Sequence, residues 1–109
     1  MKHSLEALPV REVMPGFRAR FIHSENVTLA YWDVDRGADL PSHSHAHEQI
    51  VNALEGVFNL VVDGVVHELR RGDVFVIPSH VVHSGRALTS CRLLDVFYPV
   101  REDYRAAGR

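Results

Sequence analysis

Three histidines, a carboxylate and a side-chain amide lie within seven consecutive residues, positions 43–49, with the sequence HSHAHEQ. Imidazole nitrogens and side-chain oxygens are the donors that divalent transition metals accept in proteins. One more histidine, His83, comes from a distant segment that begins at Gly72 and passes through Pro78. We therefore expect the two segments to form one mononuclear metal site.

Strand geometry selects the ligands within this run. Alternate side chains of a β-strand leave the same face, so His43, His45 and Gln49 lie together if residues 43–49 are extended. With His83 they supply three imidazoles and one oxygen, which leaves an octahedral ion two positions for water or substrate. Sites with open positions bind or transform ligands, whereas closed four-ligand sites are structural. A neutral glutamine also leaves the ion its full charge and its strength as a Lewis acid.

Two neighbouring side chains compete with Gln49. His47 has the same strand parity as the other two histidines of the run, and Glu48 replaces Gln49 if a bulge shifts the register. These residues alone leave the three alternatives open. The remaining histidines, His3, His23, His67 and His80, are expected to be ordinary exposed polar side chains.

Short β-rich runs separated by turns make up the body of the chain. We predict strands at residues 17–23, 27–34, 50–54, 57–62, 65–69, 74–77 and 91–98. Asp63-Gly64, between two of these runs, indicates a type I′ hairpin. No convincing helix separates the runs, so we predict an all-β sandwich or barrel. Its core spans roughly residues 17–98, and the charged tail, 101–109, is a short helix or frayed.

Length, charge and cysteine content narrow the class of protein. At 109 residues the chain is expected to be a single domain, 1–109. With a net charge of −2 the chain lacks the excess positive charge that typically binds nucleic acid or an anionic membrane. The single cysteine, Cys91, cannot form an internal disulfide, so a reducing cytoplasm is the simplest compartment. We see neither a signal peptide nor a run long enough to cross a membrane.

The last predicted strand, residues 91–98, is apolar on both faces. Leu93 and Phe97 point one way, and Leu94, Val96 and Tyr98 point the other. One face can pack inside a barrel, and the other then needs cover from a second sheet or a partner chain. A homodimer is therefore expected.

The residues of the proposed metal site resemble the first motif of the cupin superfamily. Gly37, His43, His45 and Gly56 fall at the motif positions, with Gln49 where the motif has glutamate. This resemblance favours Gln49 over the two competing side chains as the fourth ligand. The exchange of glutamate for glutamine leaves the metal undetermined among Ni, Zn, Mn, Fe, Co and Cu.

The second cupin motif is matched by Gly72, Pro78 and His83. His80 stands where that motif has glycine, and Ala87 stands where it has asparagine, so both departures lie outside the ligands. The resemblance implies a small β-barrel of the jelly-roll type, also called a double-stranded β-helix, with the metal near its axis.

A narrower resemblance comes from the segment 94–103, with the sequence LDVFYPVRED. Together with HSHAHEQ it is similar to the pectin-degradation cupins, which linearise the 4,5-unsaturated uronates released by pectin and alginate lyases. In that family the histidines and the glutamine bind the metal. Residues at the positions of Asp95, Phe97 and Arg101 shape the catalytic pocket.

The residues themselves also allow an ordinary structural role at each of these three positions. Asp95 shares a strand face with apolar side chains, so it either acts as an acid and base or pairs with Arg92, Arg101 or a backbone amide. Phe97 either packs in the core or covers a sugar ring. Arg101 is either a solvated charge or a bidentate partner for a substrate carboxylate.

We therefore expect a metal-dependent enzyme that converts an unsaturated uronate, a small sugar acid, to its linear keto form. Two classes compete with this interpretation. One is a dioxygenase in the same barrel, which would need a redox metal and O2. The other is a protein that binds a sugar, a metabolite or a metal without catalysis, but no DNA-binding segment of the kind found in sensors is present in the sequence.

Overall fold

The structure is a computed structural model that describes residues 1–107. Nearly all regular structure in this range is β. The strands are β1 Arg11–Met14, β2 Phe17–His23, β3 Thr28–Val34, β4 Asp39–His43, β5 Glu48–Glu55, β6 Val57–Val62, β7 Val65–Arg70, β8 Val74–Ile77, β9 His83–Ala87 and β10 Cys91–Tyr98. A 3₁₀ turn, Leu5–Ala7, precedes them, and one short helix, α1 Glu102–Ala107, follows them.

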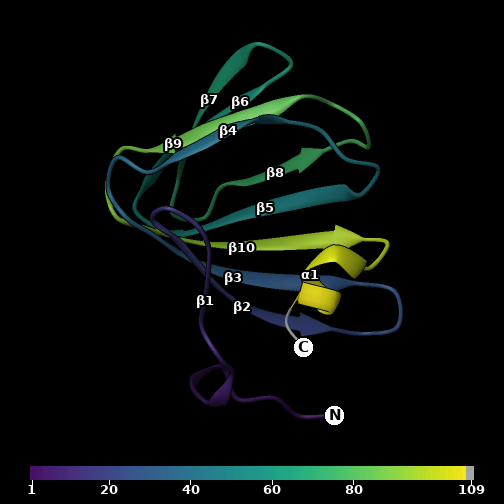
Figure 1. Ribbon diagram of the computed structural model, residues 1–109. Coiled ribbons are helices and arrows are strands. Elements are labelled where there is room, and N and C mark those ends of the chain that lie inside the picture. The colour runs from purple at the N-terminus through teal and green to yellow at the C-terminus, as the bar shows by residue number, and fades with distance from the viewer. Residues whose placement is uncertain (108–109) are drawn as a thin grey trace.

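The strands form two antiparallel sheets that face each other (Figure 1). The larger has the order β1-β2-β3-β10-β5-β8, and the smaller has the order β4-β9-β6-β7. Strands distant in the sequence are neighbours in both sheets, as in a jelly roll. The prediction of an all-β barrel is confirmed.

Alternation of side chains builds the core between the sheets. In β3 and β10 every second residue is buried, and the inward positions are mostly apolar. The face of β10 that was expected to line the barrel is buried from Cys91 to Phe97, at 2–7% exposure for its four inward side chains. Asp95 is the charged member of that face, which places a carboxylate among apolar neighbours.

The hairpin between β6 and β7 has the predicted turn. Asp63 and Gly64 both have positive φ, 49° and 77°, as a type I′ turn requires. The strands pair from Val62 and Val65 outward without a shift in register.

The run at residues 43–49 differs from the expected continuous strand. β4 ends at His43, residues 44–47 form a loop, and β5 begins at Glu48 in the other sheet. The parity argument therefore does not explain why His43 and His45 lie together, and the loop has to place His45 instead. β1 was not predicted. β4 and β9 were expected only as strands that carry His43 and His83, without bounds, because short strands rich in polar residues lack the β-rich pattern.

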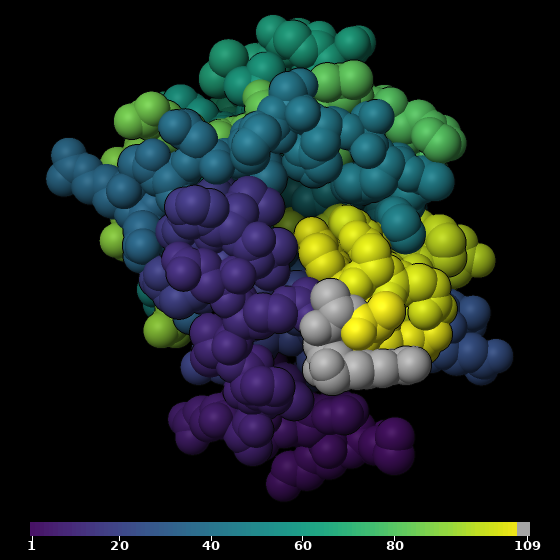
Figure 2. Space-filling model, viewed as in Figure 1, coloured from purple at the N-terminus to yellow at the C-terminus, as the bar shows by residue number. Residues whose placement is uncertain are grey.

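The predicted tail begins with an ordered helix, α1, and residues 108–109 lie outside the described range. Helix α1 covers one end of β10 and β3, and β1 lies beside it on the same face of the molecule (Figures 1 and 2). Arg11 of β1 donates to the carbonyl oxygen of Tyr104 at 3.1 Å, and its guanidinium lies over the ring of Phe21. This contact ties the helix to the edge of the larger sheet. Within residues 1–107 no helix is long and apolar enough to cross a bilayer.

Candidate functional site

Three histidines from the two motifs meet at one end of the barrel. His43 ends β4, His83 begins β9, and the two are direct partners across the strand pair. Their ring centroids lie 4.2 Å apart, and the ring of His45, from the loop, lies 5.0 Å from that of His83. One ring nitrogen of each falls within 4.8 Å of the others, which suits three ligands of one metal ion.

The backbone fixes the tautomer of each ring. A carbonyl oxygen only accepts, so a ring nitrogen beside one must carry the proton. The Nδ1–H groups donate in this way from His43 to Pro41 at 2.8 Å, from His45 to His47 at 2.9 Å and from His83 to Val81 at 2.9 Å. With Nδ1 bonded to a carbonyl, Nε2 is the ring nitrogen left to bind a metal. Metal-binding histidines usually donate their other ring N–H to a backbone carbonyl or a carboxylate in this way. Nε2 of His83 is buried and has no hydrogen-bond partner within residues 1–107.

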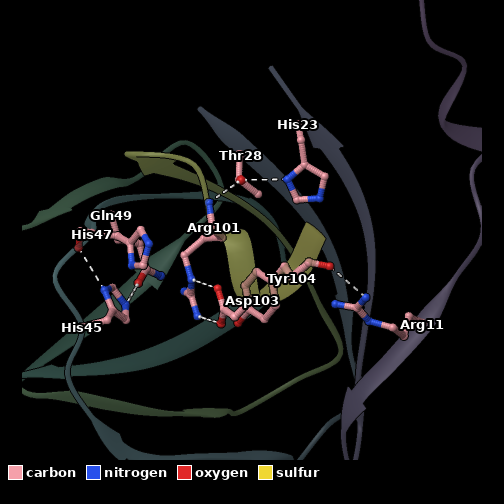
Figure 3. A network of polar contacts seen from close by, with 9 residues as sticks. All are labelled: Arg11, His23, Thr28, His45, His47, Gln49, Arg101, Asp103 and Tyr104. Atoms are coloured by element: carbon pink, nitrogen blue, oxygen red, sulfur yellow. Dashed lines mark hydrogen bonds and ion pairs between the residues drawn. The ribbon is translucent and has the colours of Figure 1, made fainter. Parts of the chain in front are cut away.

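Gln49 adds an oxygen to this cluster. Its Oε1 lies 3.1 Å from Nε2 of His45, which is the bare nitrogen of that ring (Figure 3). Burial, with the nearby charge of Arg101, lowers the pKa of His45 to about 4, so the ring stays neutral near pH 7. Two lone pairs then face each other, an arrangement that a shared cation stabilises. These residues thus fit a divalent metal.

Asp95 lies beside Gln49 in the barrel interior, and it is 7% exposed. Burial raises the pKa of Asp95 to about 7, although the Gln49 amide, the Trp32 indole and the Arg101 charge each oppose the rise. Its Oδ1 has no hydrogen-bond partner in the described part of the chain. The alternative partner Arg92 instead contacts Asp33 and Glu55 on the outer face. Asp95 is therefore a buried carboxyl group that can hold or release a proton near neutral pH.

Arg101 follows β10 and turns back over the site. Its guanidinium donates from Nε and Nη2 to the two carboxylate oxygens of Asp103, at 2.9 and 2.7 Å (Figure 3). It also lies over the rings of Phe97 and Tyr104, 4.7 and 4.1 Å from their centroids. The backbone N–H of Arg101 donates to Oγ1 of buried Thr28 at 2.9 Å. Arg101 is thus held in place from both its backbone and its side chain, and its Nη1 is outside the Asp103 pair.

His43, Gln49, Asp95, Phe97 and Arg101 line one pocket, and the rings of His45 and His83 lie next to that of His43 at its edge. The lining combines polar and aromatic side chains. The lining residues are Met14, Phe17, Trp32, Leu40, His43, Gln49, Val51, Phe58, Leu60, Leu93, Asp95, Phe97, Arg101 and Tyr104. A small molecule with both a polar and an apolar face fits such a lining.

The sequence profile of the cupin domain matches residues 30–97, more than half of the chain. The chain is a cupin. It is 27% identical over 99 residues to the pectin degradation protein KdgF of Dickeya dadantii, an alignment that covers 88% of this chain and 90% of that protein.

Solved structures agree with this assignment. The structure of KdgF from a Halomonas species is 31% identical, with a TM-score of 0.84 over 88% of this chain and 90% of that one. An RmlC-like cupin from Shewanella frigidimarina is 32% identical, with a TM-score of 0.87 over 91% and 90% of the two chains. The resemblance to pectin-degradation cupins is therefore confirmed at the level of family and fold.

The two side chains that competed with Gln49 lie outside the cluster. Glu48 is exposed at the start of β5. The ring of His47 lies 5.6 Å from that of His45, and His47 is absent from the histidine group of this cupin as far as residues 1–107 define it. The geometry thus favours Gln49 as the fourth ligand, as did the resemblance to the first cupin motif.

Sequence reasoning missed three side chains around the pocket. Trp32, Asp103 and Tyr104 were not singled out, and Thr28 was only one position within the predicted strand 27–34. The parity of β3 could have placed Trp32 inside the barrel, since it alternates with buried Ala30 and Val34. Nothing in the sequence indicates that α1 folds back against β2.

Proposed function

We propose that this cupin is a metal-dependent enzyme that opens the ring of 4,5-unsaturated uronates and yields their linear keto form. The observation that carries the proposal is a cluster of three bare imidazole nitrogens at the edge of a pocket that contains a buried carboxyl group and a fixed guanidinium. The names of the relatives support it, since two of them are KdgF proteins and one is described as a pectin degradation protein.

His43, His45 and His83 would hold the metal through Nε2, and Gln49 would hold it through Oε1. A bound divalent ion would supply Lewis acidity, which stabilises negative charge on an oxygen where it develops. The ion is one of Ni, Zn, Mn, Fe, Co and Cu, and the donor set accepts any of them. The outer hydrogen bonds to backbone carbonyls keep the three rings aimed at the same point.

Asp95 would move the proton. The substrate in its ring form is a hemiacetal whose ring oxygen also belongs to an enol ether. As carboxylate, Asp95 accepts the proton of the anomeric hydroxyl, C1 becomes an aldehyde, and the bond from C1 to the ring oxygen breaks. The ring oxygen leaves as an enolate, and Asp95 returns the proton to C4, which gives the keto group at C5. The reaction is an isomerisation and needs no oxidant.

Phe97 and Arg101 would orient the sugar acid. Phe97 is 2% exposed, and its ring lies 5.8 Å from that of His45, so it covers the inner side of the pocket next to the metal ligands. Arg101 offers the N–H groups outside its pair with Asp103 to the substrate carboxylate. Both side chains exclude water where the proton moves.

Turnover of freshly generated 4,5-unsaturated galacturonate by metal-loaded protein tests the proposal. The ultraviolet absorbance of the C4=C5 bond should fall well above the spontaneous rate, with or without O2. We expect His45→Ala to abolish the acceleration, and the exposed His3→Ala to retain it as a matched control. Asp95→Asn should bind metal and lose turnover. If it turns over like the wild type, Asp95 does not carry the proton, and if no plausible metal gives acceleration, the ring-opening function is wrong.

A homodimer in the cytoplasm remains our prediction for the assembled state. Val74, Val76 and Tyr98 are 53–58% exposed on the outer face of the larger sheet, beside Val96. A partly apolar sheet face suits a second copy of the same chain, because an isologous contact buries it on both subunits at once. Light scattering should then give a molar mass twice that of one chain. Val96→Glu should reduce the measured mass to that of a monomer, because it places a charge in the contact.

A further inference from the structure

Trp32 is the only tryptophan of the chain, and it lies in the middle of β3 with its side chain inside the barrel. It is 6% exposed. Its ring meets the edges or faces of Phe17, Phe21 and Tyr104, with centroids 5.9–6.4 Å away. These contacts fix the indole, so the direction of its N–H is set by the fold.

The indole Nε1 is buried and has no hydrogen-bond partner within the part of the chain that the structure describes. A buried donor without a partner costs about 1–3 kcal/mol, so it is rare unless something else binds it. Trp32 lines the same pocket as Asp95, whose Oδ1 is equally without a partner in residues 1–107. β3 and β10 pair with Leu93 opposite Trp32, so inward-facing Asp95 lies two residues along the neighbouring strand on the same face of the sheet.

An unsatisfied donor and an unsatisfied acceptor therefore sit side by side in the pocket. A hydroxyl group satisfies both, because its oxygen accepts while its hydrogen donates. A carboxylate only accepts and an ammonium group only donates, so each satisfies only one of them. The pair thus selects an alcohol-type oxygen.

We propose that Trp32 is a further catalytic residue, whose indole N–H donates a hydrogen bond to the substrate hydroxyl oxygen from which Asp95 takes the proton. The proposal rests on the ring-opening function proposed above. Indole is a donor only, so it does not compete with Asp95 for the proton. Negative charge grows on the hydroxyl oxygen as the proton leaves, and a fixed N–H in a dry pocket stabilises that charge.

The presence of one tryptophan makes a clean substitution available. Protein made with benzothienylalanine in place of tryptophan changes position 32 alone and replaces the N–H by sulfur in a ring of nearly the same shape. We expect kcat on the unsaturated uronate to fall about 100-fold, the loss typical of one such donor. Trp32→Phe should show the same loss. Phe21→Leu, which alters packing against the same ring and lies outside the pocket lining, should retain a rate near that of the wild type.

A binding measurement separates this contact from turnover. The ¹H–¹⁵N spectrum of the Zn-loaded protein contains one indole N–H signal, and galacturonate, a saturated uronate with an anomeric hydroxyl, serves as the probe. We expect the indole signal to shift saturably as the sugar binds.

If the indole signal stays fixed and the benzothienylalanine protein keeps the wild-type rate, the Trp32 inference is overturned while the ring-opening function stands. In that case the indole bonds to Asp95 directly, and its signal moves in Asp95→Asn without sugar. If the wild type shows no turnover but the indole signal shifts saturably, the ring-opening function fails and the contact of Trp32 with a hydroxyl group stands. If neither turnover nor a shift is seen, both are wrong.

Discussion

Thr28 connects the start of β3 to the segment that carries Arg101, and its removal is the perturbation that we work out in full. Its side chain is fully buried. Oγ1 accepts the backbone N–H of Arg101 at 2.9 Å and lies 2.8 Å from Nδ1 of His23 (Figure 3). Thr28→Val keeps the shape of the side chain and removes both contacts.

The cost follows from the two groups left behind. The N–H of Arg101 lies in a buried bond, so its loss costs about 1–3 kcal/mol, whereas half-buried His23 regains water and adds little. We expect Thr28→Val to lower the free energy of unfolding by about 2 kcal/mol, or roughly 10 °C in Tm for a domain of this size. Thr28→Ser keeps the hydroxyl and loses one buried methyl group, so it should lose only about 1 kcal/mol.

Urea denaturation of the metal-free protein measures the energies, and amide hydrogen exchange measures the bond itself. The Arg101 amide should be protected in the wild type and in Thr28→Ser, and it should exchange rapidly in Thr28→Val. The reasoning is refuted if Thr28→Val is as stable as Thr28→Ser and its Arg101 amide remains protected.

Three further outcomes are expected from urea midpoints. Gly85→Ala should lose about 1–3 kcal/mol or more, because the new Cβ would lie 2.4 Å from the ring of Phe58; a loss below that range would contradict this. His80 has φ of 67°, so His80→Gly should gain about 0.5–1 kcal/mol and His80→Ala should gain nothing; equal values for the two would refute the strain. Burial, aided by two nearby arginines, lowers the pKa of His23 in the folded protein. At low pH the unfolded chain therefore binds a proton at His23 more readily than the folded protein, and the free energy of unfolding falls as the pH drops below about 6.5. His23→Gln should make that fall shallower.

Strands with a strong β pattern could be predicted from the sequence, and strands defined by their partners could not. β2, β6, β8 and β10 begin and end where the pattern of β-rich residues does. β4 and β9 contain Pro41, Gly85 and several polar residues. β4 is a strand because it pairs with β9, and β9 is a strand because it pairs with β4 and β6. Such pairing is long-range and leaves no local signal.

The site shows the same division. His43, His45, Gln49 and His83 carry a recognisable spacing, although the reason first given for their convergence, one continuous strand, was wrong. The loop at 44–47 and the cross-strand pairing of His43 with His83 bring them together instead. The alternation of β3 could have placed Trp32 inside the barrel, whereas the position of helix α1 depends on tertiary packing, which no spacing along the chain encodes.

The strands that carry Asp95 and His43 differ in how many neighbouring strands hold them in place. β10, which carries Asp95, lies between β3 and β5 and pairs with both. β4, which carries His43, is an edge strand that pairs with β9 alone and has an irregular register between Leu40 and His43. Local opening costs least where the fewest ladder bonds must break. The rim that carries His43 should therefore open more readily than the wall that carries Asp95, so we expect a metal ion bound at the histidines to exchange on the His43 side.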